Sequence, residues 1–465
     1  MSEQEFDVMI LGAGPAGEVC AGRLGEAGLS VAIVEPHLIG GECSYYACMP
    51  SKALLRPGEL LAEVRRIPGV REAVTGGLDV EAVLKRRDEI VHDLDDSGME
   101  PWLAQRGVTI VREHGRLDGE RRVRAGEETL VARRAVVVAT GTTALLPPID
   151  GLREAKPWTN REATTAKRVP ERLAILGGGV VGVEMAQAYR SFGAQVTLIE
   201  AADRLIAREE PFASEHVEQG LRELGVDVQV GVKATAVRAT DGQVEVEVEL
   251  ESGGPVRGEE LLVAIGRRHN TDDIGLDSVG LEPGKPIDVD DSMRASDWLY
   301  AIGDVNGRAL LTHMGKYQAR VAADVIIGEE SACLLVDGSR SPRVIFTDPQ
   351  VAAVGYTLAT AQEAGLNVRT ADVPTQGNAG ASFYGRDRTA GTARLVVDED
   401  RRTVVGATFT GPEVAEFLQA ATIAVVGEVT IDRLFHAVPA FPTRSEVWLY
   451  LLEQLGVAGP CQQEA

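Results

Sequence analysis

The sequence predicts an α/β protein in which one βαβ unit occurs twice and a segment of mixed helices and strands follows. The first unit starts with an apolar run at residues 7–11, which leads into Gly-x-Gly-x-x-Gly and a helical stretch. The second unit repeats this order from residue 173. After residue 343, strand-like and helix-like runs alternate without another glycine loop. We therefore expect two Rossmann-like domains plus a C-terminal α+β domain.

Length and composition limit the number of domains and the classes of function that the chain can have. The chain has 465 residues, enough for about three domains of usual size. No uninterrupted apolar run reaches the length of a membrane span, and the N-terminus is acidic where a signal peptide would be basic. Lys and Arg number 47 against 70 Asp and Glu, and the net charge of −23 disfavours a nucleic-acid partner. We expect a soluble, cytoplasmic protein without membrane insertion.

The first glycine loop favours a bound dinucleotide. Gly12 allows the tight turn, Gly14 lets the backbone approach a pyrophosphate, and Gly17 lets the helix pack on the strand. The helix then directs its N-terminus toward the phosphates. Residues 31–34 form the next strand, and Glu35 ends it where a carboxylate can bond both ribose hydroxyls.

The second loop repeats these features at Gly177, Gly179 and Gly182, with Glu200 at the end of the next strand. Two such units imply two dinucleotides, of which one is naturally a flavin and the other a nicotinamide. Glu200 predicts NADH rather than NADPH, because a carboxylate can bond a 2′-hydroxyl but repels a 2′-phosphate. The nearby Arg204 is the residue that could offset this preference.

The segments between and after the loops complete the predicted layout. We expect helices over residues 60–102 and strands at 108–111 and 130–138, the latter ending in a small-residue turn at Thr140 and Gly141. This turn can pass close to a nucleotide or be an ordinary exit to a loop. Residues 228–232 and 244–250 are predicted to be antiparallel strands. Asp304 follows another strand, where it suits a sugar-alcohol hydroxyl or the N-cap of the next helix.

The predicted domains are residues 1–150 (FAD-binding, first part), 151–265 (NAD-binding), 266–340 (return to the FAD or central domain) and 341–465 (dimerisation). A terminal domain without a ligand signal is most often a surface for oligomerisation.

Two of the five cysteines, Cys43 and Cys48, have four residues between them, in a stretch that enters a helix through Gly40 and Gly41. A disulfide can close across one distorted turn if the Cα atoms come within roughly 7 Å, and a nearby helix N-terminus favours a thiolate. Two core cysteines, or half of a metal site, are the alternatives. The histidines are too widely spaced to complete a metal site, so we predict no metal.

Together these residues resemble the pyridine nucleotide-disulfide oxidoreductases, the family of dihydrolipoamide dehydrogenase, glutathione reductase and mercuric reductase. The likeness covers nearly the whole chain. Its marks are the two glycine loops with their terminal glutamates and the following motifs: Gly41-Glu42-Cys43, Cys48-Met49-Pro50-Ser51-Lys52, Ala139-Thr140-Gly141, Ala264-Ile265-Gly266-Arg267, Ala301-Ile302-Gly303-Asp304, Thr312-His313 and Phe346-Thr347-Asp348-Pro349.

The resemblance implies roles for matching positions. FAD would contact Glu35, Gly115, Thr140, Gly141, Asp304 and Thr312, and Gly266 would join the nucleotide-binding residues. Hydride would pass from the nicotinamide to the flavin, and electrons would leave through Cys48, the charge-transfer thiol, and Cys43, the interchange thiol. Lys52 and Glu184 would meet beside flavin N5, where a buried cation stabilises developing charge. Family members are homodimers in which the C-terminal domain of one subunit completes the disulfide site of the other.

The sequence departs from the family pattern in two places. Members that act on organic disulfides carry His-Pro-Thr-x-Ser-Glu near the C-terminus, but here Phe441 occupies the histidine position while Glu446 is retained. Tyr45 and Tyr46 also place aromatic bulk between the cysteines. Both changes argue against dihydrolipoamide as the physiological substrate. His436, five residues upstream of Phe441, is an alternative base or an ordinary loop residue.

Three functions follow from this pattern. The first is an NADH-dependent flavoenzyme with a redox disulfide and a small electron acceptor: a disulfide, a quinone or a metal ion. The second is dihydrolipoamide dehydrogenase proper with another base, and the third is a flavin-binding redox sensor without turnover. Mercuric reductase is disfavoured because the chain lacks an N-terminal metal-binding domain and a C-terminal cysteine pair, Cys461 being single.

Overall fold

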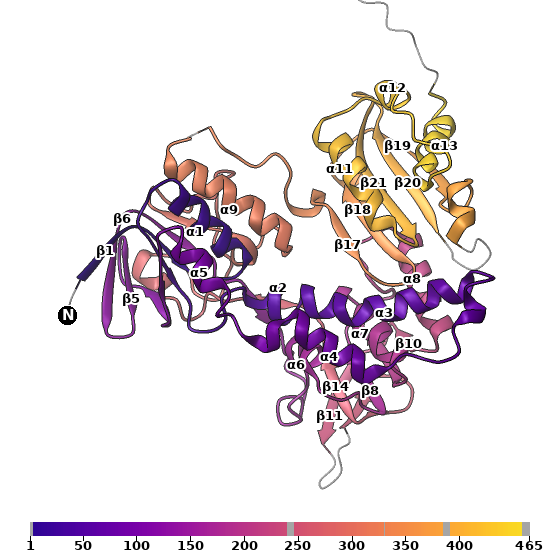
Figure 1. Ribbon diagram of the computed structural model, residues 1–465, viewed down its shortest axis with the longest axis horizontal. Coiled ribbons are helices and arrows are strands. Elements are labelled where there is room, and N and C mark those ends of the chain that lie inside the picture. Colours follow the sequence, from indigo (N-terminus) through magenta and orange to yellow (C-terminus); the bar gives the residue numbers. More distant parts are fainter. Residues whose placement is uncertain (1–2, 240–245, 330, 385–390, 458–465) are drawn as a thin grey trace, which may run out of the picture. The chain divides into compact units, whose positions relative to one another are not determined.

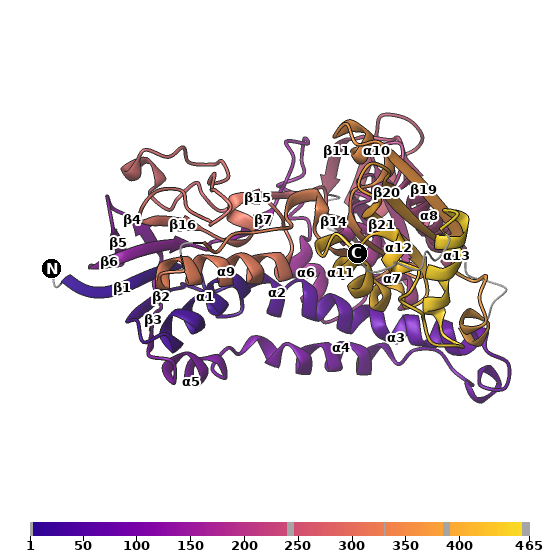
Figure 2. The ribbon, with the colours of Figure 1, turned by 90° about the horizontal axis from the view of Figure 1, so that it is seen from above.

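The structure is a computed structural model of the chain (Figures 1 and 2). It describes residues 3–239, 246–329, 331–384 and 391–457. The chain forms two compact units, each built from segments that are distant in sequence. The first unit contains Met1–Ser51, Lys85–Leu145 and Gly266–Gly338, and the second contains Lys52–Leu84, Leu146–Ile265 and Ser339–Ala465. The predicted α/β class is confirmed. The assignment of residues 1–150, 151–265, 266–340 and 341–465 to separate ligand-binding and dimerisation domains stays a prediction.

A mainly parallel sheet forms the centre of the first unit. Its strands are β1 (Glu3–Leu11), β2 (Val31–Val34), β3 (Val108–Val111), β4 (Gly115–Leu117), β5 (Arg122–Ala125), β6 (Glu128–Val138) and β16 (Leu299–Ala301). Their order is β3-β2-β1-β6-β5-β4, and β16 pairs with β6. Val8 and Ile10 of β1 pack in one core cluster, while Met9 and Leu11 pack in another. Both faces of β1 are therefore buried, which explains its unbroken apolar sequence.

Two long helices of the first unit, α1 (Pro15–Glu26) and α9 (Thr312–Ile327), lie side by side in both views (Figures 1 and 2). The two helices approach each other closely: a Cβ added to Gly315 would stand 3.4 Å from the Cβ of Ala16. Arg23 of α1 forms an ion pair with Asp324 of α9 at 2.5 Å. The packing of these two helices fixes which side chains meet along their shared face.

Shorter elements complete the first unit and connect it to the second. The unit also contains α2 (Gly41–Tyr45), α5 (Met99–Ala104) and the antiparallel pair β7 (Thr142–Ala144) and β15 (Arg267–His269). The chain passes between the units within α3 (Cys48–Arg66) and again within α4 (Val80–Ile90). Short 3₁₀ turns occur at Arg71–Ala73, His92–Leu94, Leu276–Val279, Gly303–Asn306 and Gly338–Arg340.

The second unit contains a parallel sheet in the order β10-β9-β8-β14, formed by β8 (Arg172–Leu176), β9 (Gln195–Glu200), β10 (Asp227–Val230) and β14 (Glu260–Val263). It carries α6 (Asn160–Thr165), α7 (Val180–Ser191) and α8 (Pro211–Leu224). A separate antiparallel sheet joins β11 (Ala234–Ala239), β12 (Val246–Leu250) and β13 (Val256–Gly258).

The prediction of an antiparallel strand at residues 228–232 is wrong. β10 runs parallel to β9, with Val228 opposite Leu198. The reason is that α8 connects β9 to β10, and a helical crossover returns the chain in the same direction. The predicted antiparallel strand at 244–250 is confirmed for β12, whereas residues 244–245 lie outside the described ranges.

The C-terminal part of the second unit has an antiparallel sheet in the order β17-β18-β21-β20-β19. Its strands are β17 (Arg343–Ile345), β18 (Gln350–Gly355), β19 (Val368–Pro374), β20 (Thr392–Asp398) and β21 (Thr403–Gly411). The helices are α10 (Leu358–Glu363), α11 (Leu418–Val426), α12 (Ile431–Leu434) and α13 (Val447–Gln454), and 3₁₀ turns lie at Gly380–Tyr384, Val414–Phe417 and Arg444–Glu446. Phe409 packs between the rings of Phe417 and Trp448. The predicted alternation after residue 343 is confirmed.

Within the described ranges, no helix combines the length and the apolarity that a membrane span requires.

Candidate active site

The loop between β1 and α1 has the geometry of a phosphate-binding turn. Gly12 has a φ of +104°, and a Cβ on it would stand 2.5 Å from the carbonyl oxygen of Ala139. A Cβ on Gly17 would stand 2.1 Å from the carbonyl oxygen of Gly12, so a larger residue would push α1 away from the sheet. A Cβ on Gly14 would meet no described atom within 4 Å beyond its own chain neighbours. The N-terminus of α1 thus faces room for an anionic group.

Glu35 stands at the end of β2, beside this loop. One carboxylate oxygen accepts the backbone N–H of Ala13 at 2.9 Å, and the other accepts that of His37 at 2.8 Å. These two bonds fix the plane of the carboxylate. Each oxygen keeps further acceptor capacity, so the group can still bond a sugar hydroxyl.

The second loop repeats the same construction in the second unit. A Cβ on Gly177 would stand 2.4 Å from the carbonyl oxygen of Ala264, and one on Gly182 would stand 1.8 Å from that of Gly177. A Cβ on Gly179, like one on Gly14, would meet no described atom within 4 Å beyond its own chain neighbours.

Glu200 is held in the same way as Glu35. Its carboxylate accepts the N–H of Gly178, the residue after the first glycine, at 2.5 Å and that of Ala202 at 2.7 Å. The predicted internal repeat therefore extends from sequence spacing to hydrogen bonding.

The predicted turn at Thr140 and Gly141 is tied to a distant segment. The Thr140 hydroxyl donates to the carbonyl oxygen of Asn270, and the Asn270 amide donates back to that of Thr140, both at 2.9 Å. Gly266 accepts the N–H of Leu145 at 3.0 Å. The turn is thus more than a strand exit, because it joins the chain that leaves the first unit to the chain that returns.

Gly115, another predicted nucleotide-binding residue, starts β4 at the ends of β1 and β2. A Cβ there would stand 2.6 Å from Leu11 and 2.9 Å from Val34. Glycine therefore lets β4 pass close over these two strand ends.

Asp304 occupies the second position of the 3₁₀ turn Gly303–Asn306 and is not its N-cap, which is Ile302. The Thr142 hydroxyl donates to the Asp304 carboxylate at 2.7 Å, and Arg267 donates to that same hydroxyl at 2.7 Å. Burial raises the pKa of Asp304 above its usual value. Because this side chain is largely shielded from solvent, it is suited to binding the hydroxyl group of a ligand.

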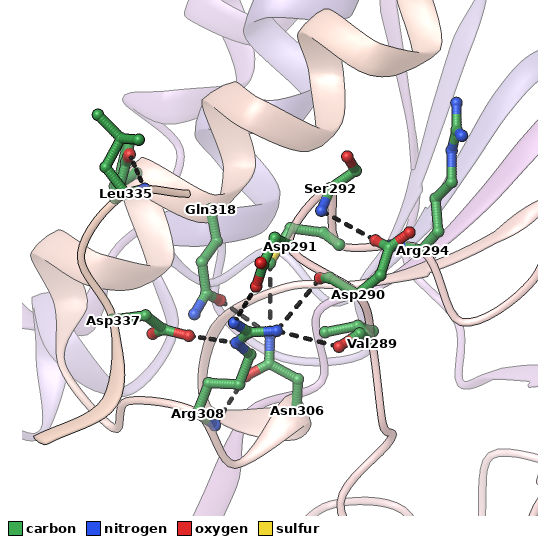
Figure 3. Close-up of polar contacts among 12 residues, drawn as sticks. Val289, Asp290, Asp291, Ser292, Arg294, Asn306, Arg308, Gln318, Leu335 and Asp337 are labelled. Atoms are coloured by element: carbon green, nitrogen blue, oxygen red, sulfur yellow. Dashed lines mark hydrogen bonds and ion pairs between the residues drawn. The ribbon is translucent and has the colours of Figure 1, made fainter. Parts of the chain in front are cut away.

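A polar network that includes Gln318 of α9 and Arg308 holds the loop that carries Asp304 (Figure 3). Gln318 of α9 accepts the N–H of Gly303 at 2.8 Å and the Asn306 amide at 2.9 Å. Arg308 pairs with Asp337 and Asp291, and it also donates to the carbonyl oxygens of Val289 and Asp290. The loop position is thereby fixed without any contribution from a ligand.

Cys43 lies in α2 and Cys48 is the first residue of α3, so the predicted helix N-terminus is confirmed. Gly40 and Gly41 both have positive φ, 113° and 55°, as the predicted entry turn requires. Among the described residues, Cys43 and Cys48 are not joined by a disulfide, and formation of the disulfide stays a prediction. The Cys48 sulfur lies 3.3 Å from the Thr312 hydroxyl oxygen.

The Cys43 thiol is affected by its neighbour Cys48. The hydrogen bond to Cys48 and burial raise the pKa of Cys43, while the Thr312 hydroxyl and the Lys316 cation act in the opposite direction. A first negative charge on the pair disfavours a second, and the expectation that the helix N-terminus favours a thiolate stays a prediction. Of the two tyrosines between the cysteines, Tyr45 is buried against Gly40 and Tyr46 is half-buried.

Lys52 and Glu184, which the resemblance pairs, do meet in the second unit. The Lys52 Nζ lies 2.7 Å from one oxygen of Glu184, whose side chain is 3% exposed. The other oxygen accepts the backbone N–H of Phe346 at 2.9 Å, and the Lys52 Nζ lies 4.8 Å from the centroid of the Phe346 ring. The glutamate thus holds the lysine at one fixed place.

In the C-terminal motif, Phe441 stands at the position where the family has a histidine, and Glu446 is retained. Phe441 is 76% exposed, whereas Glu446 is 8% exposed and its Oε2 has no hydrogen-bond partner among the described residues. His436 lies exposed beyond α12 and its ring packs edge-on against Phe435. Cys461 lies outside the described residues.

Sequence reasoning missed two charged residues of the first unit, Glu18 and Lys316. Glu18 lies in the first turn of α1, its Oε1 is buried without a partner in the described part of the chain, and burial raises its pKa to about 7. Lys316 lies in α9, one helical turn after Thr312, and it counteracts the rise in the pKa of Glu18. The i, i+4 spacing from Thr312 was the available signal for Lys316.

Within the described residues, no group of three or more His, Cys, Asp and Glu side chains is arranged to hold a metal ion. The open loops, the two fixed carboxylates and the buried Asp304 fit dinucleotide cofactors.

Comparison with known proteins agrees with this site. The family model described as pyridine nucleotide-disulphide oxidoreductase matches residues 6–323, and the model of the dimerisation domain matches residues 341–451. The chain is 30% identical to dihydrolipoyl dehydrogenase of Chlamydia muridarum over 453 residues, covering 96% of each chain. It is 28% identical to mercuric reductase of Staphylococcus aureus, covering 95% of this chain and 81% of the relative.

A solved structure shows the same fold. The Cu(II) complex of the HOCl-induced flavoprotein disulfide reductase RclA from Escherichia coli superposes with a TM-score of 0.83 at 23% identity. The match covers 96% of this chain and 99% of that one.

Proposed function

Because the chain belongs to the pyridine nucleotide-disulphide oxidoreductase family, whose enzymes depend on FAD and NAD(P)H, we propose that it passes electrons from NADH through Cys48 and Cys43 to a small acceptor. The observation that carries this proposal is the coupled thiol pair. It lies in the same unit as the first glycine loop, Glu35 and Asp304, with Thr312 in contact with Cys48.

FAD, when bound, supplies the two-electron chemistry that links a nicotinamide to a disulfide. The residues of the chain bind and orient. Glu35 and Asp304 would hold the sugar and ribitol hydroxyls, while the open turn at Gly14 would accept the pyrophosphate. Thr312 would orient the Cys48 sulfur. Lys52, fixed by Glu184, would place a cation where negative charge develops.

Two observations support NADH as the reductant. The Glu200 carboxylate is fixed beside the second loop and would repel a 2′-phosphate. Arg204, which could attract that phosphate, donates instead to the carbonyl oxygens of Glu209 and Ala207 and to the Ser214 hydroxyl, at 3.0, 2.6 and 2.7 Å. A phosphate would have to compete with these acceptors.

The C-terminal motif bears on the acceptor. Phe441 cannot exchange a proton, and the unpartnered Glu446 oxygen is what the missing imidazole would leave behind. This favours an acceptor that needs little acid-base help, such as a quinone, a metal ion or a reactive disulfide. Dihydrolipoamide oxidation is the second candidate, favoured by the 30% identity to a dihydrolipoyl dehydrogenase.

We also propose that the protein is a homodimer. The match to the dimerisation domain supports this, and so do the apolar side chains that the domain exposes at Ile423, Val438 and Phe441, which are 59%, 77% and 76% exposed.

Anaerobic titration with NADH and with NADPH tests the proposal. We expect NADH to reduce the bound flavin and to produce a pair of new thiols that Ellman's reagent detects. The Cys43→Ser/Cys48→Ser variant should gain none, whereas Cys333→Ser, at an exposed cysteine, should behave as wild type.

A lack of flavin reduction would refute the proposal. Reduction that is followed by no turnover with lipoamide, glutathione disulfide, quinones or metal ions would favour a redox sensor instead.

A further inference from the structure

We propose that Lys316, coupled to Glu18, controls the ionisation of the Cys43 thiol and so takes over part of the role that the family assigns to its C-terminal histidine. This inference rests on the proposed function, since it concerns the same thiol pair. It assigns a positioning role to two residues of the first unit, on α9 and α1.

The first step is the geometry of α9. Thr312 and Lys316 are four residues apart and lie on the same face of the helix. The Thr312 hydroxyl oxygen is 3.3 Å from the Cys48 sulfur, so this face is directed at the thiol pair. Lys316 accordingly lowers the pKa of Cys43, against the larger effects of burial and of Cys48.

The second step is the packing of α1 against α9, which brings Glu18 near Lys316. The Ala16 and Gly315 contact leaves little space between the helices. Glu18 projects from the first turn of α1 with Oε1 buried and without a hydrogen-bond partner among the described residues. Lys316 is the charged group that acts on its pKa, which burial raises to about 7.

Other titratable and charged groups of the first unit act at this place. Burial raises the pKa of Tyr45 of α2, and the carboxylates of Asp96, Glu18 and Asp95 raise it further, whereas Arg112 lowers it. Cys48 of α3 raises the pKa of Cys43 through their hydrogen bond and through its own negative charge. At neutral pH, Glu18 thus changes between a neutral acid and a carboxylate beside the lysine, and this alters how strongly the lysine stabilises a thiolate.

The electron balance explains the need for such a cation. Two electrons from NADH break the Cys43–Cys48 bond, and the hydride supplies one proton, so that one thiol and one thiolate result. Lys316 compensates the charge of the thiolate while Glu18 holds its proton. Ionisation of Glu18 cancels part of this compensation and favours uptake of a further proton by the pair.

Thiol alkylation measures the effect without requiring turnover. The holoenzyme is reduced with dithiothreitol and treated with iodoacetamide between pH 5.5 and 9, and modification of Cys43 and Cys48 is quantified separately by mass spectrometry. We expect Lys316→Gln to slow alkylation of Cys43 at pH 7 by roughly three- to tenfold, as a shift of about 0.5–1 pKa unit requires. Lys316→Arg should restore the rate.

The matched control is Lys285→Gln, which removes a lysine charge from an exposed ion pair in the same unit and should leave the rate unchanged. Glu18→Gln should match wild type below about pH 6, where Glu18 is already neutral, and should react faster above about pH 8. Thermal melting of each variant checks the fold.

Equal Cys43 rates in wild type and Lys316→Gln would overturn the inference, and so would a Glu18→Gln profile that differs from wild type by the same factor at every pH. Should Lys316→Gln not fold, the Glu18→Gln profile still decides. Failure of the proposed function would appear separately, as absence of flavin reduction by NADH.

Discussion

Replacing Phe441 by histidine should return an imidazole to the position that the family uses for proton transfer. The structure makes this a mild change. A phenylalanine side chain contributes about 200 Å², and the Phe441 side chain is 76% exposed. About a quarter of its area is therefore buried, which corresponds to about 1 kcal/mol of hydrophobic stabilisation at most. A change in turnover would thus not reflect loss of the fold of one chain, and size-exclusion chromatography of the variant checks the dimer, because Phe441 is also one of the exposed apolar side chains of the proposed interface.

The expected gain is in lipoamide turnover. General acid-base help is typically worth roughly 10²- to 10⁴-fold, and Glu446 is already buried with a free oxygen to orient the ring. We expect Phe441→His to raise NADH-dependent lipoamide reduction by roughly 10²-fold and to introduce a pH dependence near the usual pKa of histidine, about 6.5. Reduction of one-electron acceptors that draw directly on the flavin should not change.

Three further variants decide the interpretation. Phe441→Ala should show no gain, and adding Glu446→Gln to Phe441→His should remove most of it, because the oriented carboxylate is lost. His436→Ala should be neutral. If Phe441→His leaves lipoamide turnover unchanged while His436→Ala abolishes it, then His436 is the base and the reasoning about the acceptor is wrong.

Other expected outcomes concern the cofactors, the thiols and stability. Glu200→Ala should narrow the difference in kcat/KM between NADH and NADPH; equal values in wild type would contradict the role of Glu200. Cys48→Ser should abolish the long-wavelength thiolate-to-flavin absorbance of the two-electron-reduced enzyme, whereas Cys43→Ser should show that absorbance without reductant; the reverse assignment would refute the order of the thiols. Glu18 has a folded pKa of about 7, above an unfolded value of about 4.3, so its contribution favours folding at low pH and is lost as pH rises through 7. In urea titrations, Glu18→Gln should therefore remove on the order of 2 kcal/mol of the pH dependence of unfolding free energy between pH 5 and 8, and an unchanged slope would show that Glu18 is not buried as described.

The sequence was sufficient to predict those elements whose structure depends on short-range spacing. The strand, glycine loop and helix at Gly12 and Gly177 follow from spacing alone, because only glycine tolerates the close backbone contacts found there. The direction of β10 was not predictable in this way. An apolar run of a few residues suits either strand direction, and the crossover through α8 decided it.

Side-chain environments were harder to anticipate. Arg204 lies near Glu200 in sequence, but its guanidinium is occupied by acceptors of its own loop and helix, which no spacing rule reveals. Glu18 follows the third glycine in an ordinary first-turn position. Its burial depends on how closely α1 packs against α9, and that in turn depends on small residues almost 300 positions apart, Ala16 and Gly315.

The paired backbone bonds to Glu35 and Glu200 have a further consequence for the cost of binding. Each carboxylate is oriented by two backbone amide groups. Ordering a flexible side chain on association typically costs about 0.5–1.5 kcal/mol, and here that cost has already been met during folding. Both nucleotides would therefore meet rigid acceptors, and a change that loosens either loop should weaken affinity mainly through entropy while leaving the binding enthalpy nearly constant.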